Sequence, residues 1–115
     1  MPARLKLTTH VLDTASGRPA SGMKIELWFL ENDHRLRVCS VTTNAQGRTD
    51  SPLLDGDVVR AGEYELLFFV GDYFAGNAAG RFLDIVPVRV NLADGESYHV
   101  PLLCSPWSYT TYRGS

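Results

Sequence analysis

The chain has 115 residues, of which 44% are hydrophobic and 21% are charged, and its net charge at pH 7 is −2. This length and ordinary globular composition predict one domain over residues 1–115, with a core large enough to fold without cross-links. Because 13 acidic residues outnumber 11 lysines and arginines, no basic surplus is available to bind nucleic acid phosphates.

The chain also lacks signals for secretion, for a membrane and for a metal site. No apolar signal-peptide core follows the amino terminus, and no stretch approaches the roughly 18 apolar residues that span a bilayer. We therefore expect a cytoplasmic protein with no membrane partner. Its two cysteines, Cys39 and Cys104, are expected to be reduced and to serve as passive packing residues. Neither Cys-x-x-Cys nor His-Glu-x-x-His spacing occurs, so we expect no metal site.

Apolar and polar residues alternate with a period of two along most of the chain, a pattern that predicts β-strands. The expected strands are residues 5–12, 23–30, 36–43, 63–70, 85–92, 98–103 and 108–113. Seven or eight short strands with frequent turn residues predict an all-β fold, an antiparallel β-sandwich with one short helix.

Four segments add detail to this prediction. Residues 44–47 (Asn-Ala-Gln-Gly) are typical of a turn, since Asn and Gly tolerate a positive φ. Residues 63–70 are apolar on both faces, which predicts cover by the core on one side and by a partner sheet or subunit on the other. The expected helix is residues 72–79, closed by Gly80. Pro87 indicates that its strand is an edge strand or carries a bulge.

Two histidines lie inside expected strands. His10 shares a face with Lys6 and Thr8, and this is the face that a sandwich turns away from its core. His99 lies in the strand expected at 98–103. On the residues alone, each is more typical of a structural or surface imidazole than of a catalytic one, and Arg48 is typical of a solvated loop charge.

Several blocks resemble the transthyretin-like 5-hydroxyisourate hydrolases. They are LTTHVLDT at 7–14, TNAQGRTD at 43–50, YHVPLL at 98–103 with SPWSY at 105–109, and YRGS at 112–115. The resemblance covers essentially the whole chain. Its most specific part is YRGS, which matches the closing tetrapeptide of these enzymes and is lacking in true transthyretins.

The resemblance implies a transthyretin-like β-sandwich that needs no cofactor. Its implied activity is hydrolysis of 5-hydroxyisourate to 2-oxo-4-hydroxy-4-carboxy-5-ureidoimidazoline, a step of urate and purine catabolism. It also implies a homotetramer, a dimer of dimers, with the sites between the dimers. Two other functions stay open: a non-catalytic carrier of small ligands that resembles transthyretin, and a structural sandwich of the adhesion type.

The resemblance further implies particular site residues. The implied catalytic residues are His10, Arg48, His99 and Ser115, and the implied substrate-binding residues are His10, Arg48, Tyr112, Arg113 and Gly114. Hydrolysis of a cyclic amide needs an activated water, which we expect from the two histidines, and a cation beside the developing oxyanion, which we expect from Arg48. In the tail, we expect Tyr112 and Ser115 to position substrate, Arg113 to orient the tail and Gly114 to permit a close backbone approach.

Overall fold

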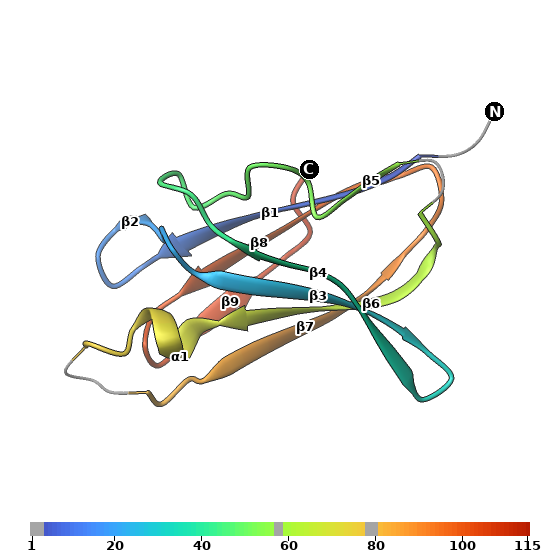
Figure 1. Ribbon diagram of the computed structural model, residues 1–115. Coiled ribbons are helices and arrows are strands. Elements are labelled where there is room, and N and C mark those ends of the chain that lie inside the picture. Colours follow the sequence, from blue (N-terminus) through green and yellow to red (C-terminus); the bar gives the residue numbers. More distant parts are fainter. Residues whose placement is uncertain (1–3, 57–58, 78–80) are drawn as a thin grey trace.

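The structure is a computed structural model that describes residues 4–56, 59–77 and 81–115. These residues form two packed β-sheets with one short helix at one end (Figure 1). The strands are β1 (Leu5–Asp13), β2 (Arg18–Pro19), β3 (Lys24–Glu31), β4 (His34–Thr42), β5 (Leu54–Gly56), β6 (Gly62–Phe69), β7 (Ile85–Leu92), β8 (Ser97–Cys104) and β9 (Tyr109–Thr111), and the helix is α1 (Val70–Tyr73). The expected all-β sandwich is confirmed.

The first sheet has the strand order β2-β1-β8-β9, and β5 also pairs with β1. Its central pair, β1·β8, is parallel, and its register runs from Lys6 opposite Ser97 to Asp13 opposite Cys104. The other pairs of this sheet are antiparallel. The first strand and a strand near the carboxyl end of the chain therefore lie side by side in the middle of one sheet (Figure 1).

The second sheet has the order β4-β3-β6-β7, and all its pairs are antiparallel. Pro87 lies in β7 at the edge of this sheet, as its missing N–H predicts. The strand expected to be apolar on both faces is β6, which lies between β3 and β7. Its residues Leu66 and Phe68 are fully buried, whereas Leu67 and Phe69 on the opposite face are half-buried.

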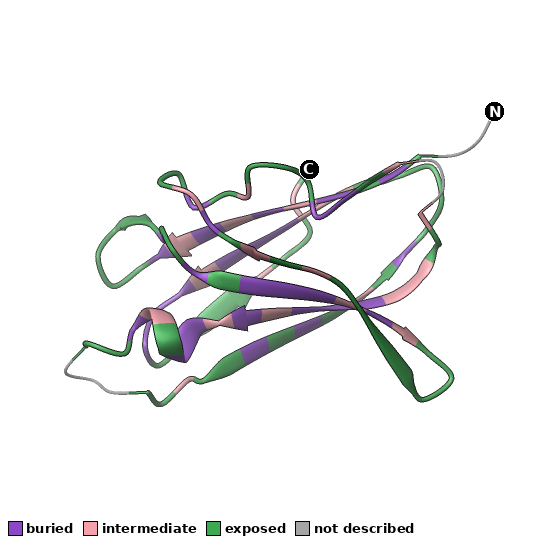
Figure 2. Cartoon of the chain, viewed as in Figure 1, coloured by how far each residue is buried: buried purple, intermediate pink, exposed green. Residues whose placement is uncertain are grey.

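The hydrophobic core lies between the two sheets (Figure 2). Alternate residues of each long strand point into it, so the period of two in the sequence becomes one buried and one open face for each sheet. The fully buried core side chains include Leu5, Leu7, Val11, Ile25, Leu27, Leu66, Phe68 and Leu102. Each such side chain contributes about 1.5–3 kcal/mol of hydrophobic stabilisation relative to exposure.

The short helix differs from its prediction. It was expected over residues 72–79, but α1 spans Val70–Tyr73 and turn residues follow it, while residues 78–80, with the expected closing Gly80, lie outside the described residues. Gly71 of this helix packs closely against Asp84, the residue before β7. Its N–H donates to the carbonyl of Asp84 at 2.8 Å, and a Cβ at this position would lie 2.8 Å from Asp84 Oδ1.

The strand count in the described ranges is nine, because β2 and β5, two and three residues long, pair with β1 at its free edge. Neither was expected, since segments this short show no periodicity. The last strand was expected over 108–113 but β9 spans only Tyr109–Thr111. Within 4–56, 59–77 and 81–115, no helix is long and apolar enough to cross a membrane.

Candidate functional site

Both candidate histidines lie on the face of the first sheet that points away from the core, which we call the outer face. The β1·β8 register places Thr8 opposite His99 and His10 opposite Pro101. Because paired residues of neighbouring strands share a face, Thr8, His10 and His99 lie on the same side of the sheet. All three are half-buried, whereas Thr9 between the first two is buried in the core. This is the placement expected for His10.

Two isolated bridges bring further expected residues to the outer face. One pairs His10 with Arg48, and the other pairs His99 with Gly114, whose N–H donates to the His99 carbonyl at 2.7 Å. The first bridge places Arg48 beside His10, at the free edge of β1. The second lays the segment after β9 along β8, on the other side of His99, so the site is made from four segments of the chain.

Gly114 fits closely against the His99 ring. A Cβ at position 114 would lie 2.6 Å from His99 Cδ2, a separation at which the ring or the backbone has to move. The close backbone approach expected at this position is therefore present. The next residue, Ser115, lines a cavity of about 180 Å³ together with Lys6, Thr8 and His99.

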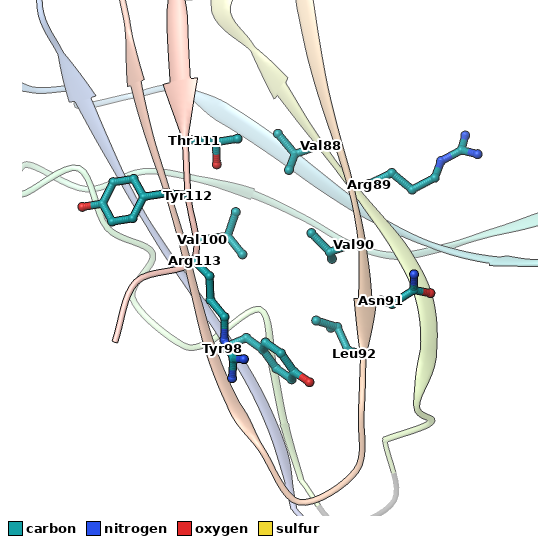
Figure 3. A pocket seen from close by; sticks show the side chains of 10 residues that line it. All are labelled: Val88, Arg89, Val90, Asn91, Leu92, Tyr98, Val100, Thr111, Tyr112 and Arg113. Carbon is teal, nitrogen blue, oxygen red and sulfur yellow. The ribbon is translucent and has the colours of Figure 1, made fainter.

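The alternation of side chains places the first two residues of the tetrapeptide, Tyr112 and Arg113, on opposite faces of the sheet. Continuing the β8·β9 register through the His99–Gly114 bridge places Tyr112 opposite Pro101 on the outer face and Arg113 opposite Val100 on the inner one. Figure 3 shows the same division, because Tyr112 points away from Val88 and Val90.

Arg113 is engaged on the far side of β8 from the His99 ring. Its guanidinium donates to Glu96 Oε1 at 3.1 Å and lies 4.4 Å from the centre of the Tyr98 ring. There it lines a cavity of about 480 Å³ with Val88 and Val90 of β7 (Figure 3). These contacts place the Arg113 guanidinium on the opposite side of β8 from the His99 ring, in a cavity that Tyr112 also lines.

The turn at residues 44–47 positions both His10 and Arg48. The side-chain oxygen of Asn44 accepts the N–H groups of Gln46 at 2.9 Å and Arg48 at 3.2 Å, which closes the turn. The Gln46 carbonyl then accepts a hydrogen bond from His10 Nε2 at 2.8 Å. A carbonyl oxygen can only accept, so neutral His10 carries its proton on Nε2 and its lone pair on Nδ1.

Gly47 lets this turn lie against β1. It has a φ of 75°, in the left-handed region that favours glycine, and its carbonyl accepts the N–H of Val11 at 2.8 Å. A Cβ at position 47 would overlap the carbonyl oxygen of Val11. The turn predicted from Asn and Gly is thus confirmed, and its packing against the strand fixes the position of the residue that follows.

Arg48 is exposed, and its guanidinium makes no hydrogen bond or ion pair with any residue in the described ranges. Most other arginines of the chain are paired, for example Arg35 and Arg89 with the buried carboxylate of Glu65. A free guanidinium beside two imidazoles is available to hold an anionic or polarised oxygen of a ligand.

His99 is in its neutral form over a wider pH range than an ordinary histidine. Burial lowers its pKa below the usual 6.5, and the positive charges of Arg48 and His10 lower it further. Its Nδ1 lies 2.9 Å from Thr8 Oγ1. A neutral imidazole has a lone pair that can accept a proton from water, so the outer face combines a base with a fixed cation.

The structure thus brings His10, Arg48, His99, Gly114 and Ser115 to one side of the sheet. The register places Tyr112 on that face too, whereas the Arg113 guanidinium lies on the other side, and both residues line the cavity of about 480 Å³. Sequence reasoning missed the contacts of Thr8 and Gln46 with the two rings. The period of two placed Thr8 on the same face as His10, but nothing in the pattern indicated that His99 lies opposite. In the part of the chain that the structure describes, no group of His, Cys, Asp or Glu side chains is arranged to hold a metal ion.

Comparisons with known proteins identify one family, and the match covers nearly the whole chain. A sequence model described as the HIUase/Transthyretin family matches residues 7–114. The chain is 54% identical to "5-hydroxyisourate hydrolase 2" of Rhizobium meliloti over 96% of both chains. Among solved structures, Klebsiella pneumoniae 5-hydroxyisourate hydrolase is 29% identical with a TM-score of 0.81, over 96% of this chain and 98% of that one. An (S)-allantoin synthase is 43% identical with a TM-score of 0.89, over 99% of this chain but only 45% of the synthase.

Proposed function

The chain belongs to the HIUase/Transthyretin family, and we propose that it hydrolyses 5-hydroxyisourate on the outer face of its first sheet. The 54% identity, over 96% of both chains, to "5-hydroxyisourate hydrolase 2" of Rhizobium meliloti supports the activity. The observation that carries the location is the guanidinium of Arg48, unpaired among the described residues, beside His10 and on the same face as His99. A carrier or an adhesion module has no need of a base and a free cation placed together.

The reaction opens a six-membered ring at an amide bond. A water oxygen bonds to the carbonyl carbon and loses a proton, and the carbon–nitrogen bond then breaks as the nitrogen gains a proton. The product, 2-oxo-4-hydroxy-4-carboxy-5-ureidoimidazoline, carries the new carboxyl group and the freed N–H. We assign the removal of the water proton and its delivery to nitrogen to the pair His10 and His99, a contribution of about 10²–10⁴-fold.

Arg48 stabilises the charge that develops on the carbonyl oxygen. Its planar fork of N–H donors has no competing hydrogen-bond or ion-pair partner in the described ranges. A donor in this role contributes about 10²–10³-fold to kcat. Because Arg48 follows the 44–47 turn, the same turn that holds the His10 ring also fixes the position of this cation.

The tail completes the pocket. Tyr112 and Ser115 position substrate from the outer face, and Gly114 lets the backbone lie against the His99 ring. Arg113 acts from the other side of β8, where its contacts with Glu96 and Tyr98 anchor the segment.

We propose further that the active protein is a homotetramer, a dimer of dimers with the sites between dimers. The outer face is open in a single chain, and the half-buried side chains of Leu12 and Leu103 lie on it beside the polar residues. A facing subunit would cover these side chains and exclude bulk water from the substrate. The two free cysteines support a cytoplasmic location.

The decay of freshly generated 5-hydroxyisourate, followed by absorbance, tests the proposal. Wild-type protein is expected to accelerate the decay, and the His99→Ala variant to lose most of this acceleration while its melting curve is unchanged. His34→Ala is the matched control, because His34 is exposed at the start of β4 in the other sheet. Lack of acceleration by the wild type, or equal rates for His99→Ala and wild type, would overturn the proposal and favour the carrier.

A further inference from the structure

The hydroxyl of Thr8 makes the contact that orients the His99 ring. Its Oγ1 lies 2.9 Å from His99 Nδ1 and 3.4 Å from the carbonyl oxygen of Tyr98. The parallel β1·β8 register places the two residues directly opposite each other. Among the described residues, neither ring nitrogen of His99 has any other hydrogen bond, so Thr8 alone decides which nitrogen carries the proton.

A threonine hydroxyl has one proton, and two arrangements are open to it here. In the first, Thr8 donates to the Tyr98 carbonyl and accepts the Nδ1–H of His99, which leaves the lone pair of the ring on Nε2. In the second, Thr8 donates to Nδ1, so the ring carries its proton on Nε2 and has no free lone pair. Only the first arrangement leaves His99 able to accept a proton from water.

The first arrangement also survives proton transfer. When Nε2 gains a proton, both ring nitrogens carry hydrogen, and Thr8 Oγ1 continues to accept from Nδ1 while it donates to Tyr98. The second arrangement fails at this point, because a protonated Nδ1 would face the proton of the hydroxyl. The hydroxyl would then have to reverse its direction in every turnover. The carbonyl of Tyr98, placed within reach of Oγ1, makes this reversal unnecessary.

We propose that Thr8 is a positioning residue that holds the proton of His99 on Nδ1, so that Nε2 exchanges a proton with water during hydrolysis. This assignment rests on the proposed function, but it concerns one hydrogen bond that can be observed without substrate. The Thr8 contact leaves Nε2 of His99 as the nitrogen that reacts, just as the hydrogen bond to the Gln46 carbonyl leaves Nδ1 of His10.

The charges around His99 make this contact important for catalysis. The charges of Arg48, which follows the 44–47 turn, and of His10 from β1 oppose a second proton on the ring, as does its burial. Lys6 of β1 lines the same cavity as His99. Glu96, the carboxylate at the β7–β8 turn, is engaged by Arg113. Ser115 lines the same cavity. Thr8 is therefore the group that supports the charged ring, by accepting from its Nδ1–H.

Thr8→Val tests the assignment, because valine keeps the branched shape and removes the hydroxyl. We expect kcat to fall about 10–100-fold with KM little changed, by analogy with the loss found when a hydrogen-bond partner that orients a metal-bound histidine is removed. The acid limb of the pH profile is expected to move to lower pH, since the imidazolium loses its acceptor. Thr8→Ser keeps the hydroxyl and is expected to restore both the rate and the profile.

Thr9→Val is the matched control. Thr9 is the next residue of β1, and its hydroxyl donates across the same strand pair to the Val100 carbonyl at 2.7 Å, but it faces the core. We expect this variant to leave the pH profile and the His99 ring unchanged, although it also removes one hydrogen bond between β1 and β8.

Imidazole ¹⁵N NMR at a pH where His99 is neutral reads the tautomer directly. The wild type is expected to carry the proton on Nδ1, and Thr8→Val is expected to lose this preference. An Nε2–H tautomer in the wild type, or a wild-type rate and pH profile in a folded Thr8→Val variant, would overturn the assignment. If the wild type shows the Nδ1–H tautomer but does not hydrolyse 5-hydroxyisourate, the proposed function fails and the Thr8 contact stands. If Thr8→Val does not fold, the wild-type spectrum decides.

Discussion

Gly114→Ala is the sharpest test of how the tail supports the site. An ideal Cβ at position 114 would lie 2.6, 3.2 and 3.3 Å from three carbons of His99, whereas ordinary contact begins at 3.4 Å. The ring or the tail therefore has to shift by about 0.8 Å. A misplacement of about 1 Å in a catalytic group costs about 10²-fold in rate, so we expect a loss in kcat approaching that size.

The effect on stability is expected to be small, because Gly114 is partly exposed and has no positive φ. The assay is the absorbance decay of 5-hydroxyisourate, measured beside a thermal melt of each variant. Gly76→Ala is the control, since a Cβ at position 76 meets nothing within 4 Å. A Gly114→Ala enzyme as fast as the wild type would show that the position of the His99 ring relative to the tail does not matter for catalysis.

Three further predictions follow from the turn and the charges around His99. Arg48→Lys is expected to lower kcat by about 10²-fold without changing the melting temperature, because an ammonium cannot reproduce the planar fork of the guanidinium. If the variant and the wild type had equal kinetics, Arg48 would be only a loop charge. The acid limb of the kcat profile is expected below pH 6.5 and should move up in Arg48→Gln, since burial and the charge of Arg48 lower the pKa of His99; a midpoint that stays fixed would contradict this. Gly47→Ala is expected to destabilise by more than the roughly 1–2 kcal/mol of a left-handed alanine, measured by urea unfolding. Gly17 has a φ of 77° and open space around its Cα, so Gly17→Ala should lose only the free energy of a left-handed alanine. Equal losses of stability in the two variants would refute the close approach of Gly47 to Val11.

The period of two was enough to predict the fold class and most strands. Buried and open faces alternate along β1 as its residues do in the sequence, so the side of the sheet on which His10 lies could be predicted. The partners of each strand could not be predicted in this way. The same alternation fits parallel and antiparallel neighbours, and nothing in the sequence of β1 or β8 indicates that the two strands pair in parallel.

This limit also explains what was missed at the site. The contact between Thr8 and His99 depends on a register between residues 91 positions apart, which no local pattern encodes. The separation of Arg113 from Tyr112 follows from alternation, but only once the tail is known to continue along β8. The tetrapeptide resemblance identified these residues as a group, and the backbone decides which of them share a face with His99.

The parallel pairing of β1 with β8 has a consequence for how activity is acquired during folding. Closing a loop of 91 residues costs about 4 kcal/mol in chain entropy from its length alone, and β1 gains its eight-residue ladder only when β8 arrives. A ribosome-bound chain that has released β1 through β7 holds His10 and Arg48 but has neither His99 nor the tail. We therefore expect hydrolytic competence to emerge among the last events of folding, later than the second sheet, whose β3·β4 hairpin joins near neighbours and whose β6·β7 pairs span at most 30 positions.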